Sequence, residues 1–132
     1  MSVLNGAAPN TVQLIGEYSS LELQNLAMRE GQHFLFAQFT GTNDKSSVLN
    51  CIAKSFGFPD YFGFNFDALY DCLTDSLFQS GVQKGFVVVL EDLPNTTQFD
   101  IEMRETLMDI FRDSANFWAS KNIPFRVFYS FN

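Results

Sequence analysis

The sequence predicts one α/β domain, and three observations lead to this prediction. The chain has 132 residues, an ordinary length for one domain with a sizeable core. Apolar residues make up 46% of it, and sixteen of them are phenylalanines. Segments with strand character alternate with segments of helical periodicity, and strands that are joined through helices form parallel sheets.

The N-terminal part is expected to add a short strand and a helix to this domain. Residues 1–10 have no clear pattern, and residues 11–16 are compatible with a strand. Ser19 and Glu22 have the spacing of a capping box, in which each side chain accepts a hydrogen bond from the other residue's backbone N–H. A helix should therefore begin there and continue to about residue 30.

The middle of the chain predicts a strand followed by two helices. The run HFLFAQFTG is apolar enough for a buried strand. Asn43 or Asp44 then caps a helix with apolar residues at helical spacing, and Gly57 ends it. Asn65 is placed to cap the next helix, which should continue to about residue 77.

The C-terminal part predicts strand, helix and strand. The run KGFVVVLED is the clearest strand of the sequence, because it is continuously apolar and β-branched, as strands buried on both faces are. Asp100 should open a long helix that continues to about Ser120. The run PFRVFYSF closes the chain as the last strand. No repeat or linker suggests a second domain.

The net charge of −7 limits the partners of the protein. A negative field repels nucleic acid and anionic membranes and attracts cationic surfaces, so we expect no direct nucleic-acid binding. We see no secretory signal and no apolar run of about twenty residues, so we expect no membrane span and a cytoplasmic location.

Residues with catalytic or metal-binding chemistry are sparse. His33 lies in a strand pattern and is expected to be structural, and Cys51 and Cys72 lie in helical patterns as small buried thiols rather than a disulfide. One histidine and two separated cysteines make no metal cluster. No phosphate-binding loop or dinucleotide fingerprint occurs. We therefore expect no cofactor, no metal and no enzyme activity.

The segment FPDYFGFNFDALYDCLTD, residues 58–75, has four aspartates among aromatic residues, and no lysine or arginine occurs between residues 55 and 83. On a helix of about 100° per residue, its apolar residues gather on one side. Asp67, Asp71 and Asp75 form a row on another side, at positions i, i+4 and i+8.

This row of aspartates has three possible meanings. A solvated helix face is the commonest meaning of such a pattern, but like charges at i, i+4 destabilise a helix by roughly 0.2–0.5 kcal/mol per pair. The row also fits one half of a complementary interface whose cationic half belongs to another molecule. Alternatively, Asp67 and Asp71 serve as acid and base of a small hydrolase; a deep pocket beside them would favour that interpretation.

The same segment resembles the signature of the barstar family, intracellular inhibitors of secreted ribonucleases. The family pattern is, loosely, Leu-Pro-acid-Tyr-Tyr-Gly-x-Asn-Leu-Asp-Ala-Leu-Trp-Asp-Cys-Leu-Thr. The matching residues are Pro59, Tyr61, Gly63, Asn65, Asp67, Ala68, Leu69, Asp71, Cys72, Leu73 and Thr74. Weaker similarity extends over residues 32–130.

The resemblance implies a fold and a function. The fold is barstar-like, with a small three-stranded parallel sheet and about four helices in residues 32–132, on which an N-terminal extension, residues 1–31, packs. The function is that of a non-enzymatic immunity protein, which covers the cationic phosphate site of a basic ribonuclease or related toxin in a 1:1 complex. The alternative within the family is an interaction module whose partner is not a ribonuclease.

The resemblance also implies roles for individual residues. Asp71 would enter the phosphate site, Asp67 would pair with a flanking basic residue, and Asp113 of the last helix would contribute an acidic contact. The other residues implied in partner binding are Tyr61, Phe62, Gly63, Asn65, Phe66, Tyr70, Thr74 and Asp75.

Four residues depart from the family pattern. Tyr70 replaces a tryptophan, Phe62 a tyrosine and Phe64 an acid, whereas Asp75 replaces a glycine and adds negative charge. These changes leave the fold prediction unaffected, but they bear on which partner is recognised, because specificity depends on such residues.

Overall fold

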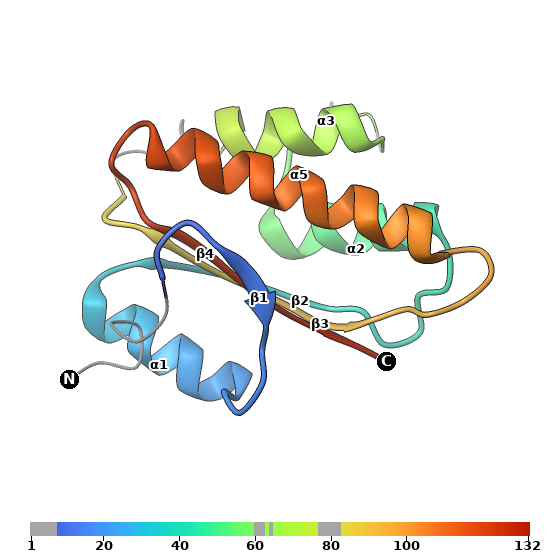
Figure 1. Cartoon of the computed structure of the whole chain (residues 1–132), viewed down its shortest axis with the longest axis horizontal. Coiled ribbons are helices and arrows are strands. Elements are labelled where there is room, and N and C mark those ends of the chain that lie inside the picture. The colour runs from blue at the N-terminus through green and yellow to red at the C-terminus, as the bar shows by residue number, and fades with distance from the viewer. Residues whose placement is uncertain (1–7, 60–62, 64, 77–82) are drawn as a thin grey trace.

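A four-stranded parallel sheet is the centre of the fold (Figure 1). The computed structural model describes residues 8–59, 63, 65–76 and 83–132. The order across the sheet is β1-β4-β3-β2, and every neighbouring pair is parallel. The strands are β1 (Val12–Leu14), β2 (His33–Gln38), β3 (Phe86–Leu93) and β4 (Phe125–Phe131). The barstar-like α/β prediction is confirmed.

The number of strands differs from the sequence prediction, because the N-terminal extension joins the sheet. β1 pairs with β4, with Val12 opposite Val127, and thus covers the edge that a three-stranded sheet would leave open. The backbone N–H of Ile15 continues this pairing by donating to the Tyr129 carbonyl at 2.8 Å.

The helices begin where the sequence predicts. They are α1 (Ser20–Glu30), α2 (Lys45–Phe56), α3 (Phe66–Asp71) and α5 (Ile101–Ala119). Each first turn is capped by a side chain that accepts a backbone N–H, and α1 has the predicted capping box. The capping residues are Ser19, Asp44, Asn65 and Asp100.

One helix differs in form from the prediction. The helix expected over residues 65–77 is α-helical only to Asp71 and then continues as a π-helical turn, η2 (Cys72–Ser76). The predicted end at residue 77 lies outside the described residues. Such i→i+5 turns are rare and are often found at functional sites.

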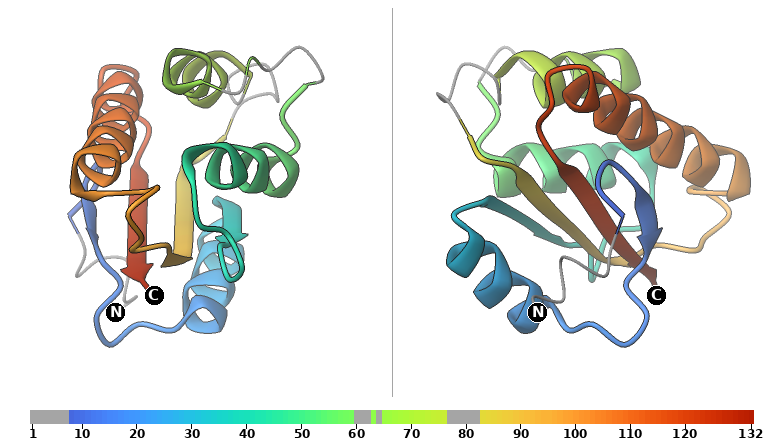
Figure 2. Two further views of the ribbon diagram at one scale, coloured as in Figure 1. Left: turned by 90° about the vertical axis from the view of Figure 1, so that its right-hand side faces the viewer. Right: turned by 60° about the vertical axis from the view of Figure 1, so that its left-hand side comes forward.

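The sheet is covered on both faces (Figure 2). On one face α2, α3 and α5 enclose the larger core, with Val88 of β3 at its centre and residues such as Leu49 and Phe111 from the helices. On the other face α1 packs Leu23 against Val87 and its neighbours. β3 is thus buried on both faces, which explains its continuous apolar run. No helix among the described residues has the length and apolar character to cross a bilayer.

Candidate functional site

The acidic helix lies on the outside of the helical layer. Figures 1 and 2 show α3 beside α5, on the side of the molecule opposite α1. Leu69 and Leu73 are fully buried in the larger core, and Phe66 packs against that core from its edge. Packing therefore holds the inward side of this helix in place, whereas its outward side makes no contribution to the core.

Asp67, Asp71 and Asp75 of α3 and η2 are exposed, and we call them the acidic face. Among the described residues no lysine, arginine or histidine lies within ion-pair distance of Asp67 or Asp71. An ion pair between Arg112 and Asp109, at 2.8 Å, lies within α5. The carboxylates of Asp67 and Asp71 are thus solvated but not neutralised.

Asn65 holds the start of the acidic helix in place. Its side-chain oxygen accepts the backbone N–H of Ala68 at 2.7 Å, and its amide nitrogen donates to the Gly63 carbonyl at 3.3 Å. A Cβ atom at Gly63 would lie 3.2 Å from that amide nitrogen, so a larger residue would crowd the cap. The cap also places Asp67 in the first turn, where the helix dipole favours a negative charge.

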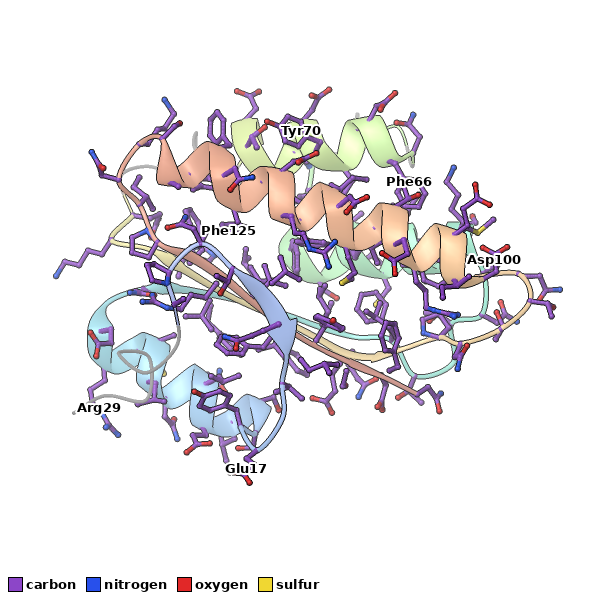
Figure 3. The ribbon with its side chains drawn as sticks, viewed as in Figure 1. Glu17, Arg29, Phe66, Tyr70, Asp100 and Phe125 are labelled. Atoms are coloured by element: carbon purple, nitrogen blue, oxygen red, sulfur yellow. The ribbon has the colours of Figure 1, made fainter. Side chains whose placement is uncertain are left out.

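Aromatic rings border the acidic face. Tyr70 and Phe66 are half-buried, and Figure 3 shows both on α3, with Tyr70 next to α5. The Nζ atom of Lys45, the first residue of α2, lies 4.7 Å from the centre of the Phe66 ring. Sequence reasoning missed this cation, because Lys45 lies outside the segment that lacks basic residues and reaches it only through the packing of two helices.

Thr74 lies mostly beneath the acidic face rather than on it. Its side chain is 6% exposed, and its hydroxyl donates to the carbonyl of Tyr70 at 2.8 Å. Next to it, the indole Nε1–H of Trp118 donates to the Leu73 carbonyl at 3.1 Å. This second hydrogen bond could not be predicted from the sequence, because its donor lies 45 residues further along the chain.

The remaining predicted residues have different positions. Asp113 is exposed on α5, the helix that packs against α3 and η2. Tyr61 and Phe62, together with the substituted position Phe64, lie outside the described residues.

The structural features that would favour a hydrolase are not found at the acidic pair. Asp67 and Asp71 are exposed rather than buried against apolar walls. Three surface depressions among the described residues, with volumes of about 400, 490 and 260 Å³, are lined by other residues. Within the same part of the chain, no group of three or more His, Cys, Asp or Glu side chains is arranged to hold a metal ion.

The histidine and the cysteines have structural positions. The His33 ring packs beside Phe86 with 5.8 Å between ring centres. Cys72 is buried, and the half-buried Cys51 donates its thiol to the Gln38 carbonyl at 3.2 Å. Burial raises the pKa of the Cys51 thiol, which keeps it protonated and a poor nucleophile.

Comparison with protein-family models gives a match. A family model described as Barstar (barnase inhibitor) matches residues 32–130, which include β2, α2, the acidic helix, β3, α5 and nearly all of β4. β1 and α1 precede the matched range. A search of curated proteins finds no match. Since the family model covers most of the sequence, the chain belongs to the Barstar family.

Proposed function

We propose that this protein is a non-enzymatic inhibitor of a basic ribonuclease and acts as the cytoplasmic immunity protein against it. The observation that carries the proposal is the pair of exposed carboxylates, Asp67 and Asp71, on the helix that bears the family signature; neither forms an ion pair with a residue that the structure describes. Members of this family are inhibitors rather than enzymes, and the site chemistry agrees with a binding role.

The proposed mechanism is occupation of a phosphate site. A ribonuclease that binds RNA phosphates has a pocket of cationic side chains, and a carboxylate is an anion that such side chains bind with charge-assisted hydrogen bonds. Asp71 fills this pocket, and Asp67 pairs with a basic residue beside it. Neither carboxylate has to leave an ion pair with a described residue first, so the attraction to the partner has to offset only the loss of hydration.

Rigidity of the helix contributes to binding in this mechanism. Leu69 and Leu73 anchor the inward side, and the Asn65 cap fixes the first turn. A surface that is already ordered loses less conformational entropy when it binds, so more of its interaction energy appears as affinity. The remaining contacts come from the rim and the preceding loop: Tyr61, Phe62, Gly63, Asn65, Phe66, Tyr70, Asp75 and Asp113, with Thr74 at the border.

The test is inhibition of a panel of small basic ribonucleases by the native protein and by Asp71→Ala and Asp67→Ala. We expect one enzyme to be inhibited tightly, and Asp71→Ala to weaken binding by roughly two orders of magnitude or more while the melting temperature holds, since it leaves the cationic pocket buried and unpaired. Glu17→Ala is the matched control, because Glu17 is exposed next to α1, far from Tyr70 (Figure 3). Equal loss in Glu17→Ala and Asp71→Ala would contradict the proposal.

A second candidate function is a barstar-like module for a toxin or regulatory protein that is not a ribonuclease. Two described departures favour it: Tyr70 replaces the tryptophan of the family pattern, and the exposed Asp75 replaces a glycine. If no ribonuclease of the panel binds, capture from the source cell with the native protein, compared with capture by Asp71→Ala, identifies a partner that depends on the same face.

A further inference from the structure

The π-helical turn η2 lies where the acidic helix leaves the α-helical form. Its residues Leu73 and Thr74 are buried, whereas Asp75 is exposed. A buried backbone carbonyl needs a hydrogen-bond donor. For Leu73 this donor is the indole N–H of Trp118, at 3.1 Å in a buried position.

Trp118 is itself held firmly. It is 1% exposed, lies near the end of α5, and contacts the Phe86 ring at 4.7 Å between centres. Phe117 packs edge-on against it at 5.3 Å. The position of the indole N–H is therefore fixed by the core, and it fixes the Leu73 carbonyl in turn.

The form of this turn decides where Asp75 lies. In an α-helix each residue advances by about 100°, so residues spaced by four drift sideways by about 40° per step. A turn closed by i→i+5 hydrogen bonds holds more residues and advances by roughly 80° per residue. Over four residues it therefore falls about 40° short of a full circle, which is a drift in the opposite direction. From Asp67 to Asp71 the chain is α-helical, and from Asp71 to Asp75 it is π-helical. With these ideal angles the two drifts cancel, so the change of helix type should bring Asp75 back into line with Asp67.

We propose that Trp118 is the positioning residue of the acidic face: by holding the Leu73 carbonyl it keeps η2 wide and Asp75 in line with Asp67. Without the indole N–H, this carbonyl takes a backbone N–H or water instead, and the turn narrows or frays. The inference rests on the proposed function, since it names a residue that orients the proposed binding surface without touching the partner.

The test removes the indole N–H donor of Trp118 and keeps the size and shape of the side chain nearly unchanged. Trp118 is the single tryptophan of the chain, so biosynthetic replacement of tryptophan by β-(3-benzothienyl)alanine changes this position alone and substitutes sulfur for the indole N–H. We expect amide hydrogen exchange of residues 72–76 to become at least tenfold faster, and affinity for the ribonuclease found in the panel to fall about tenfold. Val88→Ala, which removes core volume at a fully buried site, is the control for lost stability.

The outcomes separate the two proposals. Unchanged exchange at residues 72–76 overturns the positioning role, as does faster exchange with unchanged affinity. An equal loss of affinity in Val88→Ala overturns it too, because general destabilisation then explains the result. If no ribonuclease binds either form, the proposed function fails. The positioning role is then supported if the exchange rates of residues 72–76 and the Asp75 carboxyl chemical shift both change in the analogue but not in Val88→Ala, and it is overturned if they do not.

Discussion

Two carboxylates of one short helix, Asp67 and Asp71, are both exposed but have different positions along the helix. Asp67 lies in the first turn, where the dipole favours an anion, whereas Asp71 is followed by the helical residues of η2 and gains no such stabilisation. They also repel each other at i, i+4. The charge of Asp71 is therefore a cost to the free protein and, on the proposed function, the centre of the complex.

We expect Asp71→Asn to stabilise the free protein by roughly 0.2–0.5 kcal/mol while it weakens partner binding. Asp67→Asn relieves the same repulsion but also removes the favourable interaction of a negative charge with the N-terminal end of the helix dipole. The free energy of unfolding of this variant should therefore rise less or fall. Urea denaturation of the two variants and the native protein measures the difference. A loss of stability in Asp71→Asn would show that its carboxylate has a structural role within the fold.

The sequence was sufficient to predict the part of the site that depends on local geometry. Asn65 caps the helix and both aspartates are exposed, because helical periodicity and capping involve only neighbouring residues. It did not reveal the hydrogen bond that the Thr74 hydroxyl donates to the Tyr70 carbonyl, and the role of Thr74 at the border of the contact stays a prediction. It also missed Lys45 next to Phe66, because that contact requires the packing of α2 against α3.

Among the helices, α2 has a start that responds to pH. The Asp44 side chain accepts the backbone N–H of Ser47 at 2.8 Å, and the Ser47 hydroxyl lies 3.1 Å from the Asp44 backbone N–H. Hydrogen bonds from the Ser47 side chain and then its backbone lower the pKa of the Asp44 carboxyl below its ordinary value of 3.8. The cap therefore stabilises the fold above pH 3.8, and this contribution is lost as the pH falls through the lower pKa of the folded state.

Asp44→Asn should remove this part of the acid sensitivity. Asparagine caps helices about as well as aspartate and does not titrate, so near neutral pH the variant should be close to the native protein in stability. Below pH 3.8 the native protein loses the contribution of Asp44, and the variant does not. Thermal denaturation at pH 6 and pH 3 measures both proteins; an equal drop in melting temperature would contradict the assignment.

Among the helices, the residue at which each begins was easier to predict from the sequence than the change from α-helix to π-helix. The four capping residues act within three residues of their own position; three of them were predicted outright, and the fourth, Asp44, was one of two candidates with Asn43. The change from α3 to η2 was not predicted, and the hydrogen bond that the Leu73 carbonyl of η2 accepts comes from Trp118 on another helix, which the local sequence does not reveal. The pairing of β1 with β4 likewise joins the two ends of the chain, and the short apolar run at residues 11–16 says nothing about which strand it joins.

The N-terminal extension contributes to the core of the whole molecule, although the family match begins at residue 32. α1 covers one face of the sheet, and its Leu23 is fully buried against residues of β3 and β4. Leu23→Ala should therefore lower the free energy of unfolding by about 2–5 kcal/mol, as cavities in cores do. Leu21→Ala is the matched control, since Leu21 on the same helix is 65% exposed and should change stability little. Equal, small effects would mean that α1 is dispensable for the domain.

The distribution of charge over the whole molecule predicts how a cationic partner approaches. The net charge is −7, and the acidic face adds a local concentration of negative potential on one side. Such fields accelerate the encounter of opposite charges, and dissolved salt screens them with a Debye length of about 8–10 Å near physiological ionic strength. The association rate constant should thus fall steeply as salt is added, whereas the dissociation rate constant should change much less.

Asp75→Asn and Glu17→Gln distinguish the local field from the net charge, because each removes one charge from a different side of the molecule. If the acidic face steers the partner, Asp75→Asn slows association and flattens its salt dependence, and Glu17→Gln, next to α1, has a much smaller effect. Stopped-flow association with the identified partner at several salt concentrations measures both rates. If the two variants slow association equally, net charge alone guides the encounter, and the acidic face acts only after contact has been made.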